Sequence, residues 1–299
     1  DIDALPIKEN TGLPFSSEVS GKCHACGHDL HTTVLIGAAR LLKEYQNDLC
    51  GTIKLIFQPG EEVMTGAAKT IANGALENPK PDFILACHTW PDMPAGSIGV
   101  RKGTMLGASD SFKVKVIGKG GHAAHPQKGI DPVVIAAHII TQLQTIVYRR
   151  VEAIDPVVVT VGHLEAGTAA NIIPETAVLQ GTIRTNKPEA RELLVRRMKE
   201  VAEKTAAVYN GTVDIEMISE VPPLICNPKL TDEVVGYMQE LGIPGLTPYP
   251  GISASASEDF AVIAEKVPST FMYLSAGYLD ERGQYPAHHP KAQFNEDVC

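Results

Sequence analysis

Two cysteines and three histidines lie within nine positions, in the segment Gly21-Lys-Cys-His-Ala-Cys-Gly-His-Asp-Leu-His31. Cys26 and His28 are two residues apart, so in an extended segment both side chains project to the same side. Thiolate and imidazole are typical zinc ligands, and cobalt, nickel and manganese also accept them. The segment constrains the fold because a metal centre needs further ligands, which distant parts of the chain must bring to the same place.

The same segment allows a second interpretation, because Cys23-His-Ala-Cys26 fits the C-x-x-C pattern of thiol-redox proteins. A thioredoxin-type motif opens a helix after the first strand, and this context is not found around Cys23. A zinc ribbon requires a second C-x-x-C, which the sequence lacks. A non-catalytic metal-binding or thiol-redox module therefore stays open as an alternative to a catalytic centre.

The composition is that of a soluble globular protein, with 299 residues, 44% hydrophobic and 20% charged. This length is sufficient for two domains. The net charge of −9 argues against nucleic acid or an anionic membrane as partner, and no apolar stretch reaches the roughly 18 residues of a membrane span. Six cysteines are too few for a disulfide scaffold, which favours a reducing compartment, the cytoplasm. The chain begins at Asp1, so a signal peptide would not be visible.

The outer thirds of the chain show the alternation of helices and strands that is typical of an α/β fold. We expect helices over 31–47, 64–77, 231–241 and 258–266, the third ended by Gly242, and strands over 52–57, 82–88 and 269–275. The middle third differs. There we expect strands over 111–118, 156–162, 176–185 and 212–218, with helices over 131–149 and 188–209. This β-α-β-β-α-β order is the ferredoxin-like motif. It predicts an inserted domain over 110–220, within a catalytic domain formed by 1–109 and 221–299.

Three further segments carry side chains that can bind metals. In Gln58-Pro-Gly-Glu-Glu62 the paired glutamates alone would indicate an acidic helix start, but beside a metal one can bind the cation while the other acts as a base. His88 ends a strand, where ligands of open α/β sheets gather, although a lone histidine there is more often structural. His288-His289-Pro290 alone would be an exposed loop. Five nitrogen, oxygen and sulfur ligands are more than one open catalytic zinc site uses, and they suit two metals roughly 3.5–4 Å apart.

Together these segments closely resemble the peptidase M20 family, the dinuclear metallopeptidases that include aminoacylases and carboxypeptidases. The resemblance covers His24–Asp29, Gln58–Glu62, the strand ending in His88 and His288–Phe294, in the expected order. It is strongest to the amidohydrolase branch, which contains N-acyl-amino-acid deacylases, hippurate hydrolase and auxin-conjugate hydrolases. The resemblance implies a zinc-exopeptidase-like α/β/α catalytic domain with an inserted ferredoxin-like lid domain.

The resemblance also implies roles in the catalytic domain. Asp3, in the opening Asp1-Ile-Asp3-Ala-Leu-Pro6 segment, orients a ligand histidine, and Glu61 is the general base. Asp1 carries the free α-amino group, so its role stays open. His24 packs near the site, and His31 is structural or peripheral. The implied ligands of two divalent ions, which could be zinc, manganese, cobalt or nickel, are Cys26, His28, Glu62, His88 and His288.

In the inserted domain, the resemblance implies three substrate-facing residues. His122, in Gly118-Lys-Gly-Gly-His122, polarises the scissile carbonyl, often across a dimer. A phosphate loop is the alternative, but a Walker Lys-Ser/Thr pair is missing. Asn171 and Arg184 hold the substrate carboxylate, for which the guanidinium fork is suited, and a surface salt bridge is the alternative for Arg184. The other histidines there, His125, His138 and His163, are left as structural.

The expected function is hydrolysis of N-acyl amino acids to a carboxylic acid and a free amino acid by a metal-activated water. A dipeptidase or carboxypeptidase on the same centre is the alternative. The implied partners are a small N-acyl amino acid or dipeptide and a second copy of the chain, bound through the lid domain. Whole family members carry a further segment before the opening Asp-x-Asp and a closing helix after the region where this sequence stops. They also carry an aromatic residue where Ala292 stands.

Overall fold

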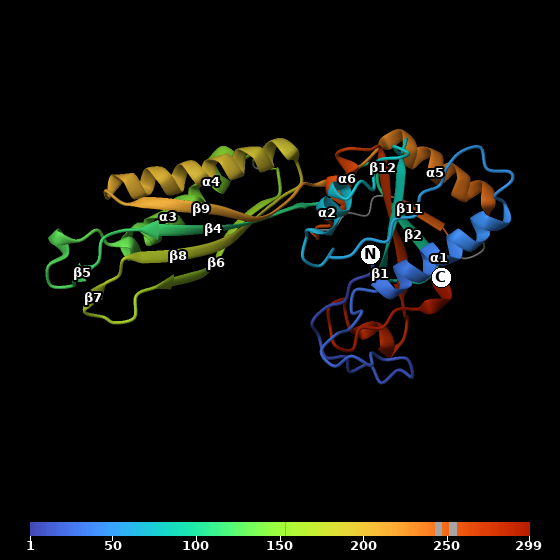
Figure 1. Cartoon of the computed structure of the whole chain (residues 1–299), viewed down its shortest axis with the longest axis horizontal. Helices are drawn as coiled ribbons and strands as arrows, with labels where there is room; N and C mark the ends of the chain where they lie inside the picture. Colours follow the sequence, from blue (N-terminus) through green and yellow to red (C-terminus); the bar gives the residue numbers. More distant parts are fainter. Residues whose placement is uncertain (153, 243–246, 251–255) are drawn as a thin grey trace. The chain divides into compact units, whose positions relative to one another are not determined.

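The computed structural model describes residues 1–152, 154–242, 247–250 and 256–299. The chain divides into two compact units (Figure 1). Unit 1 comprises Asp1–Met105, Leu224–Ala254 and Glu258–Cys299, and unit 2 comprises Leu106–Pro223 with Ser255–Ser257. Among the described residues, no helix combines the length and the apolar character needed to cross a bilayer.

Unit 1 is built on a four-stranded mixed sheet with the order β1-β12-β2-β11. β1 and β12 are parallel, which places His88 opposite Tyr273, and β2 runs antiparallel to β12. A separate ladder joins β10 and β3. The strands are β1 (Ile84–Pro94), β2 (Ser97–Val100), β3 (Gly103–Leu106), β10 (Leu224–Cys226), β11 (Thr247–Pro250) and β12 (Ser269–Gly277). The helices are α1 (His28–Glu44), α2 (Gly66–Ala72), α5 (Pro228–Leu241) and α6 (Phe260–Ala264), with 3₁₀ turns η2 (Glu281–Gln284) and η3 (Glu296–Val298).

Most of the predicted elements of unit 1 are confirmed, including the end of α5 at Gly242, which has φ +58°. The strand predicted over 52–57 is wrong. Ile53, Leu55 and Phe57 alternate as in a strand, but no described segment forms a ladder with them, and β1 pairs with β12 instead. An alternating pattern produces a strand only where a partner supplies hydrogen bonds.

Unit 2 is an antiparallel sheet with the order β6-β8-β4-β9, packed against α3 and α4 (Figure 1). The predicted β-α-β-β-α-β order of elements is observed. Asp131 begins the first helix as expected, because its side chain accepts a hydrogen bond from the Val133 amide at 2.8 Å. The elements are β4 (Ala108–Ile117), β5 (Gly121–His122), η1 (Pro126–Lys128), α3 (Pro132–Arg150), β6 (Val157–Ala166), β7 (Ile172–Ile173), β8 (Thr176–Thr185), α4 (Pro188–Val208) and β9 (Thr212–Val221).

Candidate metal centre

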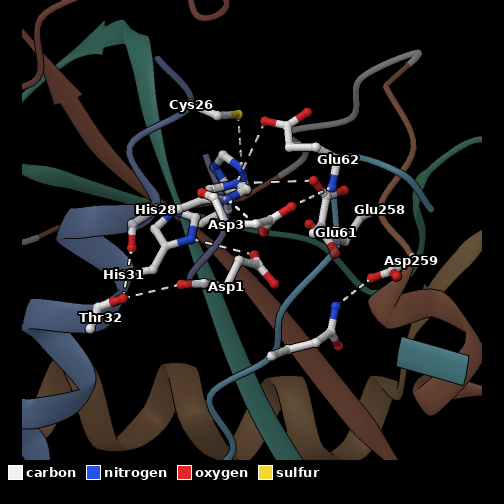
Figure 2. Close-up of polar contacts among 12 residues, drawn as sticks. Asp1, Asp3, Cys26, His28, His31, Thr32, Glu61, Glu62, Glu258 and Asp259 are labelled. Carbon is white, nitrogen blue, oxygen red and sulfur yellow. Dashed lines mark hydrogen bonds and ion pairs between the residues drawn. The ribbon is translucent and has the colours of Figure 1, made fainter. Parts of the chain in front are cut away.

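Five side chains from distant parts of unit 1 meet at one place, and Figure 2 shows three of them, Cys26, His28 and Glu62. The thiol Sγ of Cys26 lies 3.5 Å from Nε2 of His88 and 3.3 Å from Nε2 of His288. The Oε1 atom of Glu62 lies 3.4 Å from Nε2 of His288 and 4.0 Å from Nε2 of His28. The structure therefore brings together all five residues that the sequence analysis named as ligands.

Gly27 makes the approach of Cys26 and His28 possible. It has φ +80°, in the left-handed region that residues with a Cβ rarely adopt. A Cβ at this position would lie 2.3 Å from Oγ1 of Thr89 and 3.1 Å from Cε1 of Phe294. The two ligands thus converge through a tight turn into the first residue of α1, and the extended segment assumed from their spacing is wrong.

The protonation of two histidines is set by their neighbours. Nδ1 of His28 lies 3.2 Å from both Oδ1 and the backbone oxygen of Asp3. Nδ1 of His88 lies 2.6 Å from the backbone oxygen of Thr89. Since these oxygens only accept hydrogen bonds, Nδ1 carries the proton in each ring and the Nε2 lone pair faces the cluster. Metal-binding histidines are held in this way by carboxylates and carbonyls.

Glu61 and Glu62 both lie close to the Nε2 atom of His28. Oε2 of Glu61 is 4.0 Å from Nε2 of His28, and the Glu61 side chain is buried. The backbone amide of Glu62 donates to Oδ2 of Asp3 at 3.0 Å, so the same aspartate orients both His28 and the glutamate loop. One glutamate can therefore bind a cation while its neighbour faces the reacting water.

The electrostatics of the cluster favour neutral groups when no cation is bound. Burial, with the charges of Glu62 and Asp259, raises the pKa of Glu61 to about 8. Burial and the two glutamates also raise the pKa of the Cys26 thiol, and burial lowers the pKa of His28 to about 4. A divalent cation would reverse the penalty on the thiolate and the carboxylates, because opposite charge favours the ionised form.

Two buried atoms of the cluster, Nε2 of His28 and Oε1 of Glu62, have no hydrogen-bond partner. Leaving such an atom unpaired costs about 1–3 kcal/mol. Cys26, His28 and His88 form one group of possible ligand atoms, and Cys26, Glu62 and His288 form a second, with all atoms of a group within 4.8 Å of one another. The residues present therefore fit two adjacent divalent cations of the zinc type.

His31, for which a structural or peripheral role was expected, packs against the ring of His28. Its ring centroid lies 5.0 Å from that of His28. The Thr89 amide donates to Nε2 of His31 at 2.9 Å, so Nδ1 carries the proton and faces Oδ2 of Asp1 at 3.4 Å. Asp1, His28 and His31 form another group of possible ligand atoms. Asp1 thus belongs to the surroundings of the centre.

Glu258 and Asp259 are buried beside Glu61 (Figure 2). Neither residue was among the site residues expected from the sequence. Burial, together with the charges of Glu61 and Asp259, raises the pKa of Glu258 well above its ordinary value. The sequence signal was an acidic pair before the apolar segment Phe260–Ala264, which equally predicts a solvated helix start. Only the tertiary fold distinguishes the two cases.

The three substrate residues proposed from the resemblance lie in unit 2. His122 is exposed on β5, and its Nδ1 accepts from the Ala124 amide at 3.0 Å. The Ala123 amide donates to the backbone oxygen of Asn171 at 3.1 Å, so these two segments are neighbours. Arg184 lies on β8 and donates from Nη1 to Oγ of Ser257 at 3.0 Å. Within unit 2 the structure thus brings His122 and Asn171 close in the fold.

The mixed α/β fold and the cluster of possible nitrogen, oxygen and sulfur ligands are the features expected of a metal-dependent hydrolase. The sequence model of Peptidase family M20/M25/M40 matches residues 1–299, and the chain belongs to this family. It is 40% identical over 296 residues to N-acetyl-L-cysteine deacetylase from Bacillus subtilis (strain 168). The matched region covers 99% of this chain and 69% of that relative.

Solved structures agree with this assignment. The crystal structure of a putative aminohydrolase from methicillin-resistant Staphylococcus aureus has a TM-score of 0.93 at 33% identity, covering 99% of this chain and 75% of that one. A dinuclear metal-binding peptidase of the M20 family from Bacillus subtilis has a TM-score of 0.81 at 34% identity, covering 100% and 75%. The α/β fold and the family resemblance are confirmed, and the protein is a metal-dependent hydrolase of amide bonds.

Proposed function

We propose that this protein hydrolyses N-acyl amino acids to a carboxylic acid and a free amino acid. The reaction takes place at two divalent ions, zinc, manganese, cobalt or nickel, held by Cys26, His28, Glu62, His88 and His288. The observation that carries the proposal is the convergence of these five side chains, in which the histidine Nε2 atoms lie 3.3–4.0 Å from Sγ of Cys26 or Oε1 of Glu62. The similarity to a deacetylase of an N-acylated amino acid supports the substrate class.

Glu61 is the proton carrier in this proposal. When bound, such ions would lower the pKa of a nearby water toward roughly 7 and so make hydroxide available. The Glu61 carboxylate accepts a proton from the attacking water and returns it to the leaving nitrogen. Burial raises the pKa of Glu61 to about 8, and nearby cations would oppose that shift. A pKa near the working pH suits a group that must both accept and donate a proton.

Asp3 orients both a proposed metal ligand and the loop that carries the proton carrier. Asp3 fixes the His28 tautomer and accepts from the Glu62 amide, so a single carboxylate orients a ligand and the loop of the base. Such supporting groups typically change metal affinity or activity about 10- to 100-fold when they are replaced.

Unit 2 supplies substrate contacts in this proposal, as a lid domain over 110–220. His122 donates a hydrogen bond to the scissile carbonyl, a contact that is typically worth about 2.7–4 kcal/mol in the transition state. Asn171 and Arg184 bind the substrate carboxylate. The guanidinium geometry and the position of His122 beside the Asn171 segment support these roles. Loss of Arg184 should raise KM for N-acyl amino acids far more than for their amides.

We also propose a homodimer formed through unit 2 and a location in the cytoplasm. The sheet of unit 2 ends in two edge strands, β6 and β9, and an edge strand can pair with a second copy. All six cysteines, each in a described part of the chain, are free thiols, as in a reducing compartment. Sedimentation velocity on the whole protein tests the dimer.

A substrate screen tests the activity. The protein is loaded in turn with each of the four metals and assayed with acetyl-, benzoyl- and indoleacetyl-amino acids and with dipeptides. Release of free amino acid from the N-acyl compounds is the expected result. Preference for dipeptides would favour the peptidase alternative, and no hydrolysis with any metal would refute the proposal.

A further inference from the structure

The loop that carries Glu61 and Glu62 has no regular secondary structure between residues 58 and 65. Two of its residues, Gly60 and Met64, have positive φ angles of +79° and +55°. A non-glycine residue in this region is held there by its surroundings. The position of Glu61 therefore depends on contacts made by the ends of the loop.

One buried carboxylate contacts both ends of this loop. Oδ1 of Asp259 accepts from Nε2 of Gln58 at 2.7 Å, and Oδ2 accepts from the backbone amide of Ala67 at 2.9 Å. Asp259 and Ala67 are 0% exposed and Gln58 is 5% exposed. Because water cannot replace either partner, breaking one of these bonds leaves a buried polar group unpaired. Asp259 itself lies beside Glu258 and Glu61 (Figure 2).

The two ends of the loop are in close contact, so a shift at one end reaches Glu61. The Gly66 amide donates to the backbone oxygen of Gly60 at 3.0 Å. A Cβ on Gly66 would lie only 2.1 Å from the backbone oxygen of Pro59. The backbone oxygen of Gln58 also accepts from the Ile2 amide at 3.0 Å. These contacts tie the start of the loop to its end and to the N-terminal segment.

We propose that Asp259 is a positioning residue, which holds the loop over 58–65, through its first residue and through the start of α2, so that Glu61 and Glu62 face the metal centre. The inference rests on the proposed function for the role of Glu61. Asp259 acts through Gln58 and Ala67, whereas Asp3 accepts a hydrogen bond from the Glu62 amide within the loop. We call the pair of hydrogen bonds made by Asp259 the Asp259 clamp.

An exchange of the two side chains tests the Asp259 clamp. Gln58→Glu places a second carboxylate against Asp259 and removes the donor. In the double variant Q58E/D259N, the introduced asparagine amide donates to the introduced glutamate, and its oxygen can still accept from Ala67. Hydrogen bonding is then restored with the donor and acceptor reversed. Gln144→Glu, at an exposed position of α3, introduces the same charge and is the matched control.

The metal-loaded Q58E protein should show kcat reduced about 10- to 100-fold, as for a misplaced catalytic group, with KM close to that of the wild type. The double variant should regain most of the loss, and Q144E should behave as wild type. Hydrogen–deuterium exchange of the peptide over 58–67 supplies a readout independent of activity. Exchange should be faster in Q58E and restored in Q58E/D259N.

Two results would overturn the inference: wild-type kcat and exchange in Q58E, or a double variant as impaired as Q58E. The second would mean that the charge of Asp259, and not its hydrogen bonding, matters. If Q58E does not fold, Gln58→Met removes the donor without adding charge, and unchanged kcat and exchange in that variant would equally refute the clamp. A wild type that hydrolyses no amide refutes the proposed function, while the exchange comparison still tests the clamp.

Discussion

Replacement of Gly27 by alanine tests how the fold brings two ligands together. Gly27 has φ +80°, and its Cα faces Oγ1 of Thr89 and the ring of Phe294. The substitution adds one methyl group between Cys26 and His28 and changes neither ligand. Any effect on metal binding must therefore come from the turn or from the neighbours that the methyl group displaces.

The expected cost has two parts. A residue with a Cβ in the left-handed region costs about 1–2 kcal/mol. A Cβ 2.3 Å from Oγ1 of Thr89 also forces neighbours to move, and overpacking of this kind costs about 1–3 kcal/mol. Together the free energy of unfolding should fall by about 2–5 kcal/mol, from a total that is typically 5–15 kcal/mol. Metal affinity should fall about 10- to 100-fold because both ligands shift.

Urea denaturation followed by circular dichroism, and calorimetric titration with zinc, measure the two effects. Gly37→Ala is the matched control, since Gly37 lies within α1 with nothing within 4 Å of an added Cβ. That substitution should stabilise the protein by about 0.5–1 kcal/mol. If Gly27→Ala were as stable as wild type and bound zinc as tightly, the explanation of the turn would be refuted.

Four further outcomes are expected. Glu61→Gln should keep both metals by elemental analysis but lower kcat about 10²–10⁴-fold, and near-normal turnover would contradict its role. Asp110 is fully buried and accepts hydrogen bonds from Arg191 at 2.7–3.1 Å. Arg191→Ala removes this charged partner and should lower the free energy of unfolding of unit 2 by about 3–5 kcal/mol; an unchanged denaturation curve would argue against a stabilising role of the pair. Burial raises the pKa of the Cys26 thiol, and it raises the pKa of Glu61 to about 8, so both groups hold protons at pH 7 without metal and metal binding should release these protons. Calorimetry in buffers of different ionisation enthalpy measures the number of protons released, which should be smaller in Cys26→Ser. Chelation should lower the melting temperature. Metal at 1,000 times Kd should raise the free energy of unfolding by about 4 kcal/mol relative to the metal-free protein, and a melting temperature insensitive to chelator would be inconsistent with a bound metal.

The proposed metal ligands could be selected from the sequence because their side chains share metal-binding chemistry. Each motif alone allows another interpretation, but a Cys-x-His pair, a glutamate pair after a strand and histidines in two further segments together favour a shared metal site. Local signals also located helix ends correctly. Asp131-Pro132 begins α3 and Gly242 ends α5 because capping and a positive φ angle are decided within a few residues.

The supporting residues could not be predicted in this way. Glu258-Asp259 and Glu61-Glu62 are both acidic pairs near a helix start, and only burial under the rest of unit 1 separates them from a solvated surface. Gln58 carries no pattern of its own, since its partner Asp259 is 201 residues away. The wrong strand over 52–57 has the same cause, because strand pairing is a tertiary property.

Five side chains of unit 1 are proposed to hold two metal ions. A crystal structure of the zinc-loaded protein, with anomalous diffraction at the zinc edge, would locate the ions themselves. Two peaks are expected in unit 1, each about 2.0–2.3 Å from ligand atoms, with Cys26, His28, Glu62, His88 and His288 as the ligands. A single peak, or peaks bound by other residues, would contradict this proposal.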